Sequence, residues 1–191
     1  MAAADAAELV SVLARAFCNG AVAAWVQPDA SRRLRYNEVL FATLVAEVFL
    51  TRRQIDTEGT PPLAVAVWAP PGTWELTADE ASVVRRRLSE ELGDDAERVG
   101  SGFEATDRRH PADPHWYLAF LGVEPEHQGE GHGARLLRRG LRRCDDAGEA
   151  AYLWTAERRN VDFYRQHGFA VSWEARIPGG PPAWGMWREP G

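Results

Sequence analysis

The spacing of apolar residues predicts three helices in the first half of the chain. The first helix has an apolar stripe with i, i+3, i+4, i+7, i+8 spacing, formed by Leu9, Val12, Leu13, Ala16 and Phe17. Asp5 is its expected N-cap, and the helix is expected to end near Cys18. A second helix is expected over residues 34–51, and a third after the capping-box sequence TADE at residues 77–80.

Short apolar runs bounded by turn residues predict the strands. LAVAVWA, WYLAFLGV and AAYLWTA read as buried strands, and FAVSWEARI and AWGMWRE as an antiparallel pair joined across PGGPP. Helices are expected at residues 133–147, ended by Gly148, and over VDFYRQH, with Asn160 as N-cap and Gly168 as C-cap. Residues 93–114 have little periodicity and are expected to form a loop with some helix, bordering a site.

Length and composition narrow the class of protein. The 191 residues suffice for a single domain, residues 1–191, and the mixture of helices and strands is typical of an α/β fold. A net charge of −6 argues against a nucleic-acid partner, because phosphate binding needs a basic face. The longest apolar stretch, VLFATLVAEVFL, is too short to span a membrane and contains Glu47. Cys18 and Cys144 belong to no CxxC pattern and the N-terminus lacks a basic start, so a reducing cytoplasmic location is expected.

A glycine-rich loop stands between the strand that ends at Val123 and the helix that follows. Gly129, Gly131 and Gly133 permit positive φ and leave the backbone accessible. The first amides of the next helix are unpaired and lie at the positive end of its dipole. Such a loop favours an anion, a phosphate or a pyrophosphate, and a connection without any ligand is the alternative.

Three kinds of phosphate loop compete for this stretch. A P-loop needs GxxxxGK[ST], and the chain has no such string. The dinucleotide fingerprint GxGxxG/A matches at Gly129, Gly131 and Ala134, but residues 124–128 separate it from the strand and too little chain follows for the remaining strands. The third pattern, Q/RxxGxG/A, matches residues 128–133 in full.

This loop resembles that of the GNAT superfamily of N-acetyltransferases, and NVDFYRQHGF resembles the family's Asn-x-x-x-Tyr segment before a Gly-Phe turn. Other segments, such as LAVAVWAPP and PGGPPAWGMWREPG, resemble puromycin N-acetyltransferase and its relatives. The resemblance implies a central mixed, mostly antiparallel sheet with splayed parallel strands, flanked by helices, and a cofactor-binding core at about residues 112–191. The family's first strand has no counterpart here, so a homodimer partner is one way to cover the sheet edge.

The resemblance also assigns residues to acetyl-CoA, the co-substrate of the family. The pantetheine arm would pair with the strand backbone at Leu121, Gly122 and Val123. The pyrophosphate would take its amides from the loop, formed by Gln128, Gly129, Glu130, Gly131, His132, Gly133 and Ala134. Asn160 would contact the cofactor arm, and Tyr164 would donate a proton to the departing thiolate.

The sequence departs from the family pattern at the positions expected to hold the general base. Two positions at which family members carry a glutamate hold Tyr117 and Trp154. His115 is the candidate catalytic base, because imidazole titrates near neutral pH, and Asp113 and Glu124 are alternatives. Packing or capping is the competing interpretation of His115.

Aromatic residues suggest the acceptor. Tyr117, Trp154 and Trp184 would line a pocket for an aromatic or drug-like amine, with core packing as the alternative. No metal is expected, because two histidine pairs are five residues apart rather than four: His110 and His115, and His127 and His132.

Together these observations predict an N-acetyltransferase that acts in a direct ternary complex. Its acceptor is expected to be the amine of a small molecule, an antibiotic or aminonucleoside-like compound. The alternatives are acetylation of peptide or protein amines, a CoA-binding module without activity, and a nicotinamide-dinucleotide protein.

Overall fold

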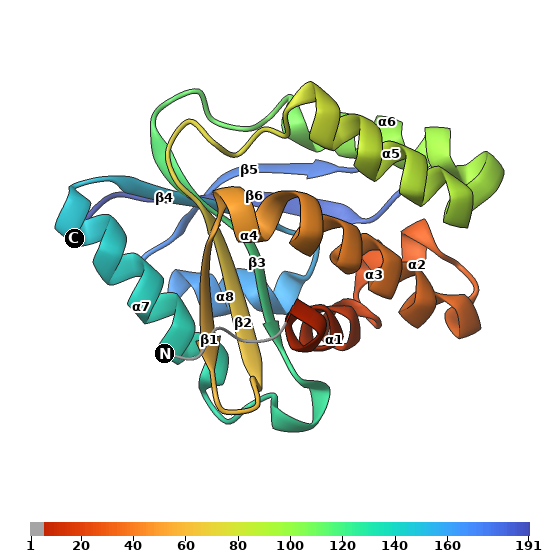
Figure 1. Ribbon diagram of the computed structural model, residues 1–191. Helices are drawn as coiled ribbons and strands as arrows, with labels where there is room; N and C mark the ends of the chain where they lie inside the picture. The colour runs from red at the N-terminus through yellow and green to blue at the C-terminus, as the bar shows by residue number, and fades with distance from the viewer. Residues whose placement is uncertain (1–5) are drawn as a thin grey trace.

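Helices cover a central sheet on both faces, α1 to α6 on one and α7 and α8 on the other (Figure 1). The computed structural model describes residues 6–191, so the expected N-cap Asp5 lies outside the described part. The helices are α1 (Ala6–Phe17), α2 (Ala21–Val26), α3 (Ala30–Leu44), α4 (Leu50–Arg52), α5 (Ala78–Leu92), α6 (Ala96–Asp107), α7 (His132–Ala147) and α8 (Arg158–Arg165). The strands are β1 (Gln54–Glu58), β2 (Ala64–Ala69), β3 (His115–Val123), β4 (Ala150–Thr155), β5 (Ala170–Arg176) and β6 (Pro182–Arg188).

The six strands form one sheet in the order β1-β2-β3-β4-β6-β5. Neighbouring strands are antiparallel except β3 and β4, which are parallel. The predicted mixed, mostly antiparallel sheet is therefore confirmed. A bulge in β3 leaves Ala119 without a partner, because Val67 pairs with Phe120 while Trp68 pairs with Leu118.

The two faces of β2 supply two separate parts of the core. Ala64, Ala66 and Trp68 belong to the cluster under α7 and α8, and Val65 and Val67 to the cluster under α1 and α3. All six residues of β2 are buried, which explains why its sequence is a continuous apolar run rather than an alternating one.

Several elements differ from the sequence expectation. The apolar pattern predicts neither β1 nor α2, and α6 occupies more than half of residues 93–114, where a loop with some helix is expected. Asn160 does not cap α8. The helix begins at Arg158 with Glu157 as N-cap, because the Asn160 amide already donates to the Glu157 carbonyl at 3.0 Å.

Other local predictions are confirmed. Thr77 and Glu80 form both hydrogen bonds of a capping box at the start of α5. Gly148 ends α7 in the left-handed region, with φ of +66. The C-cap of α8 differs from the prediction, because it is Gln166; Gly168 follows two residues later with φ of +88, and its amide donates to the Arg165 carbonyl at 3.1 Å.

The termini and surface carry three further findings. Within residues 6–191, no strand precedes α1, and β1 forms one edge of the sheet. In that same range no helix has the length and apolar character needed to cross a bilayer. Cys18 and Cys144 are both free thiols, as expected.

Candidate active site

β3 and β4 separate after a short stretch of pairing. Their ladder runs only from the pair His115–Ala150 to the pair Tyr117–Tyr152. Beyond Tyr117, β3 continues to Val123 with β2 as its partner. The side of β3 that faces β4 therefore loses its strand partner at Tyr117, and we call this place the splay.

The register identifies the backbone groups that face the splay. The Glu124 amide donates to the Leu63 carbonyl at 2.8 Å, and hydrogen-bonded pairs alternate along an antiparallel ladder from that point. The N–H and C=O groups of Leu121 and Val123 therefore point away from β2 and into the splay. Gly122 has a packing role instead, because a Cβ there would lie 3.0 Å from a side chain of α1.

The glycine loop leads from β3 into α7. Gly129 and Gly131 have φ of +88 and +83, and Gly131 is the N-cap of α7 without a side-chain cap. Among the described residues, the amides of 129–134 donate to no protein acceptor. The Gln128 side chain donates to the Val123 carbonyl at 3.3 Å and so ties the loop to β3. Free amides at the positive end of the α7 dipole form a site for a phosphate-like anion.

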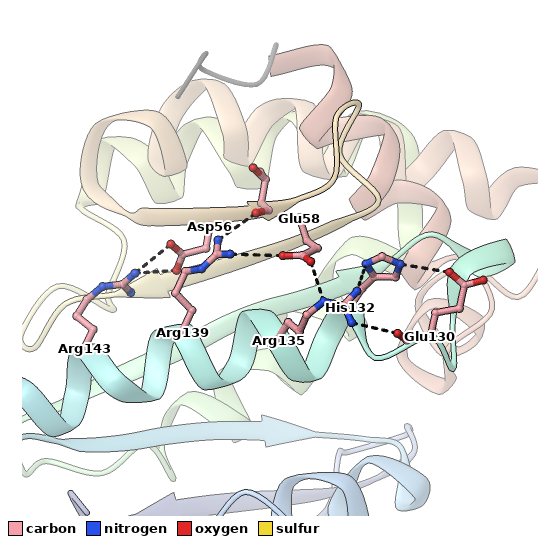
Figure 2. A network of polar contacts seen from close by, with 8 residues as sticks. Asp56, Glu58, Glu130, His132, Arg135, Arg139 and Arg143 are labelled. Atoms are coloured by element: carbon pink, nitrogen blue, oxygen red, sulfur yellow. Dashed lines mark hydrogen bonds and ion pairs between the residues drawn. The ribbon is translucent and has the colours of Figure 1, made fainter.

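A chain of polar contacts connects this loop to the edge strand (Figure 2). Arg135 donates to Glu58 at 2.7 Å, to the Glu130 carbonyl at 3.2 Å and to Nδ1 of His132 at 2.7 Å. His127 and His132 each contact the Glu130 carboxylate at 3.2 Å, and these hydrogen bonds lower the pKa of Glu130 below its ordinary value. The carboxylate of the loop is thus engaged by its neighbours.

His127, Glu130 and His132 also come close enough to share a metal ion, since one ligand atom of each lies within 4.8 Å of the others. The hydrogen bonds of His132 place its ring proton on the nitrogen that such a site would need as a ligand. Its Nδ1 accepts from Arg135, so the ring proton lies on Nε2 and points to Glu130. A metal at Nε2 would need the other tautomer. The expectation that no metal binds stays a prediction.

Two further arginines of α7 contact β1 (Figure 2). Arg143 donates to both carboxylate oxygens of Asp56, at 3.0 and 2.8 Å. Arg139 donates to the Thr57 carbonyl at 3.1 Å and to Glu58 at 3.4 Å. These contacts fix α7, and with it the glycine loop, against the sheet edge. The homodimer expected from a missing first strand stays a prediction.

Tyr164 lies on α8, which packs on β4, β5 and β6. Its side chain is 8% exposed, within the same core cluster as Trp68. Burial raises the pKa of Tyr164 well above its ordinary value, so the hydroxyl keeps its proton. Among residues 6–191 this hydroxyl has no hydrogen-bond partner. Asn160, one turn earlier, donates to Oγ1 of Thr155 at 3.4 Å, at the end of β4.

His115 lies in a buried aromatic cluster on the α6 side of the sheet. Its Nδ1 is 2.6 Å from the Asp113 carbonyl, to which it must donate, so its Nε2 accepts from Nε2 of His110 at 2.9 Å. Burial lowers the pKa of both rings, that of His110 to about 3 with the nearby His115 as the second cause. Contrary to expectation, His115 has no nitrogen free to receive a proton from an acceptor.

The two alternative bases are placed elsewhere. Glu124 forms a two-contact ion pair with Arg15 of α1, at 2.9 and 2.5 Å. Asp113 is exposed in the turn before β3, and its carbonyl holds His115.

Tyr117 and Trp154 lie together on the α6 side of the sheet, and the pocket expected between them stays a prediction. Burial raises the pKa of Tyr117, Trp154 lies close enough to the Tyr117 hydroxyl to oppose that rise, and Tyr117 stacks on Tyr152 with ring centroids 5.8 Å apart. Phe103 of α6 faces Trp154 at 6.4 Å. Trp184 belongs to the core cluster on the other face, so the structure removes it from this set.

Sequence reasoning missed Asp107, the last residue of α6. Its side chain is exposed, yet the surrounding protein removes part of its hydration. This loss, together with the charges of Glu104 and Glu75, raises the pKa of Asp107 to about 6. The Asp107 charge in turn raises the pKa of Tyr117 and Tyr152, which means that the carboxyl lies near both rings. The weak helical period of α6 is the signal that would have placed it.

Known proteins share this arrangement. The model of the acetyltransferase (GNAT) family matches residues 66–169, more than half of the chain. A solved structure from Corynebacterium glutamicum ATCC 13032, of histone acetyltransferase HPA2 and related acetyltransferase, has a TM-score of 0.75 and 26% identity, covering 100% of this chain and 94% of its own.

Two more distant structures show the same fold. A GNAT-family acetyltransferase from Desulfovibrio desulfuricans has a TM-score of 0.55 and 15% identity, covering 97% of this chain and 92% of its own. PH1933 from Pyrococcus horikoshii OT3 has a TM-score of 0.54 and 12% identity, covering 96% and 92%.

The residues that match the family model include β3, the glycine loop, α7, β4 and α8, which are the elements around the splay. Members of this family use acetyl-CoA as their acetyl donor. With more than half of its length matched and the same fold in solved relatives, the chain belongs to the GNAT family of acetyltransferases.

Proposed function

We propose that this chain transfers the acetyl group of acetyl-CoA to the amine of a small molecule. The proposal is supported by three features of the elements that flank the splay. These are the N–H and C=O groups of Leu121 and Val123 that have no strand partner, the N-terminus of α7 behind Gly131, and the hydroxyl of Tyr164. Among the described residues that hydroxyl has no hydrogen-bond partner, and the Tyr164 side chain belongs to the core cluster on which Leu121 and Val123 pack.

The residues present fit acetyl-CoA. Amides 129–134 find no acceptor within the described part of the chain, as a pyrophosphate site requires, and a Cβ on Gly129 would meet nothing within 4 Å, so the space beside the loop is open. Leu121 offers its N–H and C=O groups, and Val123 its N–H group, to an extended arm that carries amides, whereas the Val123 carbonyl already accepts from Gln128. When bound, acetyl-CoA supplies an acetyl group activated as a thioester.

The protein's own groups have distinct roles in this proposal. Tyr164 holds a proton that can pass to a thiolate, because burial keeps its hydroxyl neutral. The amides of Leu121 and Val123 are donors for an oxygen that gains negative charge. Cys144 does not serve as a nucleophile, because burial raises the pKa of its thiol to about 12. These features support direct transfer in a ternary complex.

The acceptor is proposed to be a drug-like amine, such as an antibiotic or aminonucleoside-like compound. Support comes from the aromatic side chains Tyr117, Trp154 and Phe103 beside the splay, and from segments that resemble puromycin N-acetyltransferase. Flat apolar walls favour a compact aromatic body over an extended peptide. Acetylation of peptide amines is the second candidate, and a cytoplasmic location stays part of the proposal.

Acetyl-CoA with tyramine or puromycin is expected to release free thiol, whereas a short peptide with a free N-terminus is expected to react more slowly. The measurement is thiol release for each amine at fixed acetyl-CoA concentration. In parallel, CoA but not NAD should raise the melting temperature, because ligand binding stabilises the folded state. Tight CoA binding without turnover for any amine would favour a binding module, and a larger shift with NAD would favour a dinucleotide protein.

Gly131→Ala is expected to weaken acetyl-CoA binding about tenfold. Alanine is strained at φ of +83 by roughly 1–2 kcal/mol, and its Cβ would lie 3.3 Å from the Arg135 guanidinium. Isothermal titration calorimetry measures the loss. Gly148→Ala is the matched control, because it introduces the same strain at φ of +66 at the other end of α7 with no neighbour within 4 Å. Equal binding losses in both variants would show that the loop has no special role.

A further inference from the structure

We propose that Asp107 binds the ammonium group of the acceptor and accepts its proton, acting as the general base of the reaction. This proposal rests on the proposed function. It also narrows the acceptor to a primary ammonium attached to a flat apolar group. The base is supplied by α6, a helix that precedes β3 in the chain, rather than by a strand of the sheet.

The placement of Asp107 follows from its neighbours along α6. Phe103 lies one helical turn earlier, and its ring faces Trp154 at 6.4 Å. His110 comes just after the helix, and its ring contacts Tyr117 at 4.9 Å and Tyr152 at 4.8 Å. Residues three and four apart share one side of a helix. Asp107 therefore shares with Phe103 the side of α6 that faces Trp154, and the turn after the helix brings His110 to the rings of Tyr117 and Tyr152.

That position is the start of the splay. Tyr117 and Tyr152 form the last β3–β4 pair, and Trp154 follows on β4. An amine held here would lie beside the point at which β3 loses its strand partner. The aromatic rings of Tyr117 and Trp154 would contact the apolar body of the acceptor and attract its positive charge.

The carboxyl of Asp107 has no protein partner that would explain its position. Among the described residues its side chain takes part in no hydrogen bond or ion pair. It also lies at the C-terminus of α6, where the helix dipole disfavours a negative charge. A bound ammonium would pair with the carboxylate and would offset its repulsion by the negative end of the helix dipole.

The charges that face Asp107 come from several elements. Glu104 and Arg108 lie beside it in sequence, and Glu75 comes from the turn before α5. Tyr117 on β3 and Tyr152 on β4 lie near it from the sheet, and Arg53 and His110 lie near Tyr117. Lost hydration and the two glutamates raise the pKa of Asp107 to about 6, so it is ionised at neutral pH but more basic than an ordinary aspartate.

The proton balance assigns one role to each titrating group. The ammonium nitrogen loses two protons as its bond to the acetyl carbon forms and the thioester C–S bond breaks. One proton passes to Asp107 and from there to water. The other replaces the proton that Tyr164 gives to the sulfur. No oxidant, metal or additional reactant is needed.

The neighbouring histidines are weaker candidates. His110 is a poor base, with its pKa lowered to about 3, and its ring is stacked on Trp74 with centroids 3.7 Å apart. His115 has both nitrogens engaged. Asp107 is left as the group that is basic, accessible and next to the splay.

Asp107→Asn is expected to lower kcat/KM for tyramine about 100-fold at neutral pH and to leave the KM for acetyl-CoA unchanged. In the wild type, kcat/KM should rise with pH through about 6 as Asp107 loses its proton, and the variant should lack this limb. Asp107→Glu should retain the limb. Glu97→Gln is the matched control, because it removes one charge from an exposed residue in the first turn of α6. Wild-type pH dependence in Asp107→Asn would overturn the proposal.

A binding measurement separates this proposal from the proposed function. Tyramine titrated into the protein without acetyl-CoA should bind at least about tenfold more weakly to Asp107→Asn than to the wild type or Glu97→Gln. Aniline, an arylamine that is uncharged at neutral pH, should bind all three alike. If the wild type shows no transfer to any amine but this binding pattern holds, the proposed function fails and the amine site stands. Equal tyramine binding in all three proteins overturns the site.

Discussion

Tyr164→Phe is expected to lower kcat for acetyl transfer about 10²- to 10⁴-fold, with little change in the KM for acetyl-CoA. The substitution removes only a hydroxyl that has no partner within residues 6–191 and leaves the buried ring in place. Because burial raises the pKa of Tyr164, its acid form persists through the neutral and mildly alkaline range. Steady-state kinetics with varied acetyl-CoA separate kcat from KM.

Tyr36→Phe is the matched control for this prediction. Tyr36 is also buried, with 4% exposure and a pKa raised by burial, but it lies on α3 in a different part of the core. Removing its hydroxyl should leave kcat unchanged. If Tyr164→Phe retains wild-type kcat, the general acid is another group or water, and the ring of Tyr164 is simply part of the core.

Trp68→Ala is expected to lower the free energy of unfolding by about 3–5 kcal/mol, because it empties one of the largest fully buried sites of the core. Trp68 lies against Gly140 of α7, where an added Cβ would come within 2.4 Å of the indole. Gly140→Ala should therefore destabilise by about 1–3 kcal/mol through overpacking. Urea unfolding followed by circular dichroism measures both losses.

A double substitution tests whether this contact is the cause. Trp68→Phe makes room beside residue 140, so Trp68→Phe combined with Gly140→Ala should cost less than the sum of the two single changes. Gly100→Ala on α6 is the control, because its Cβ would meet nothing within 4 Å. That change should be neutral or stabilising by up to about 1 kcal/mol. Strict additivity of the pair would contradict the proposed clash.

The backbone geometry of the proposed cofactor site is predictable from the sequence because its signals are local. The glycine loop, with Gly129 and Gly131 in the left-handed region, stands next to its own strand and helix. The same holds for the segment that carries Tyr164. In each case a few consecutive residues fix the backbone, so a motif predicts the geometry.

The acceptor half depends on contacts between distant segments. Strand β1 escapes the apolar pattern because its buried residue is Asp56, whose charge is balanced by Arg143 far along the chain. Glycines in helix α6 weaken its helical signal in the sequence. Gly102 is required because a Cβ there would come within 2.3 Å of Trp25. Without α6, Asp107 could not be placed near the splay.

Two aromatic assignments show the same limit. His115 looked available because nothing in the sequence shows that His110 occupies one of its nitrogens. Trp184 could have been excluded, because Trp184 and Trp187 are three apart on one strand and must face opposite sides. Trp187 contacts His115 on the α6 side, and Trp184 lies in the other core cluster.

The bulge at Ala119 changes which face each odd-numbered residue of β3 occupies. Tyr117 lies on the α6 side, whereas Leu121 and Val123 pack on the α7 side, although an unbroken strand would point all three the same way. On the proposed function, one strand thereby serves two routes of entry from opposite faces of the sheet. A reactant bound on one face would then leave the other face open. Either reactant could therefore bind first.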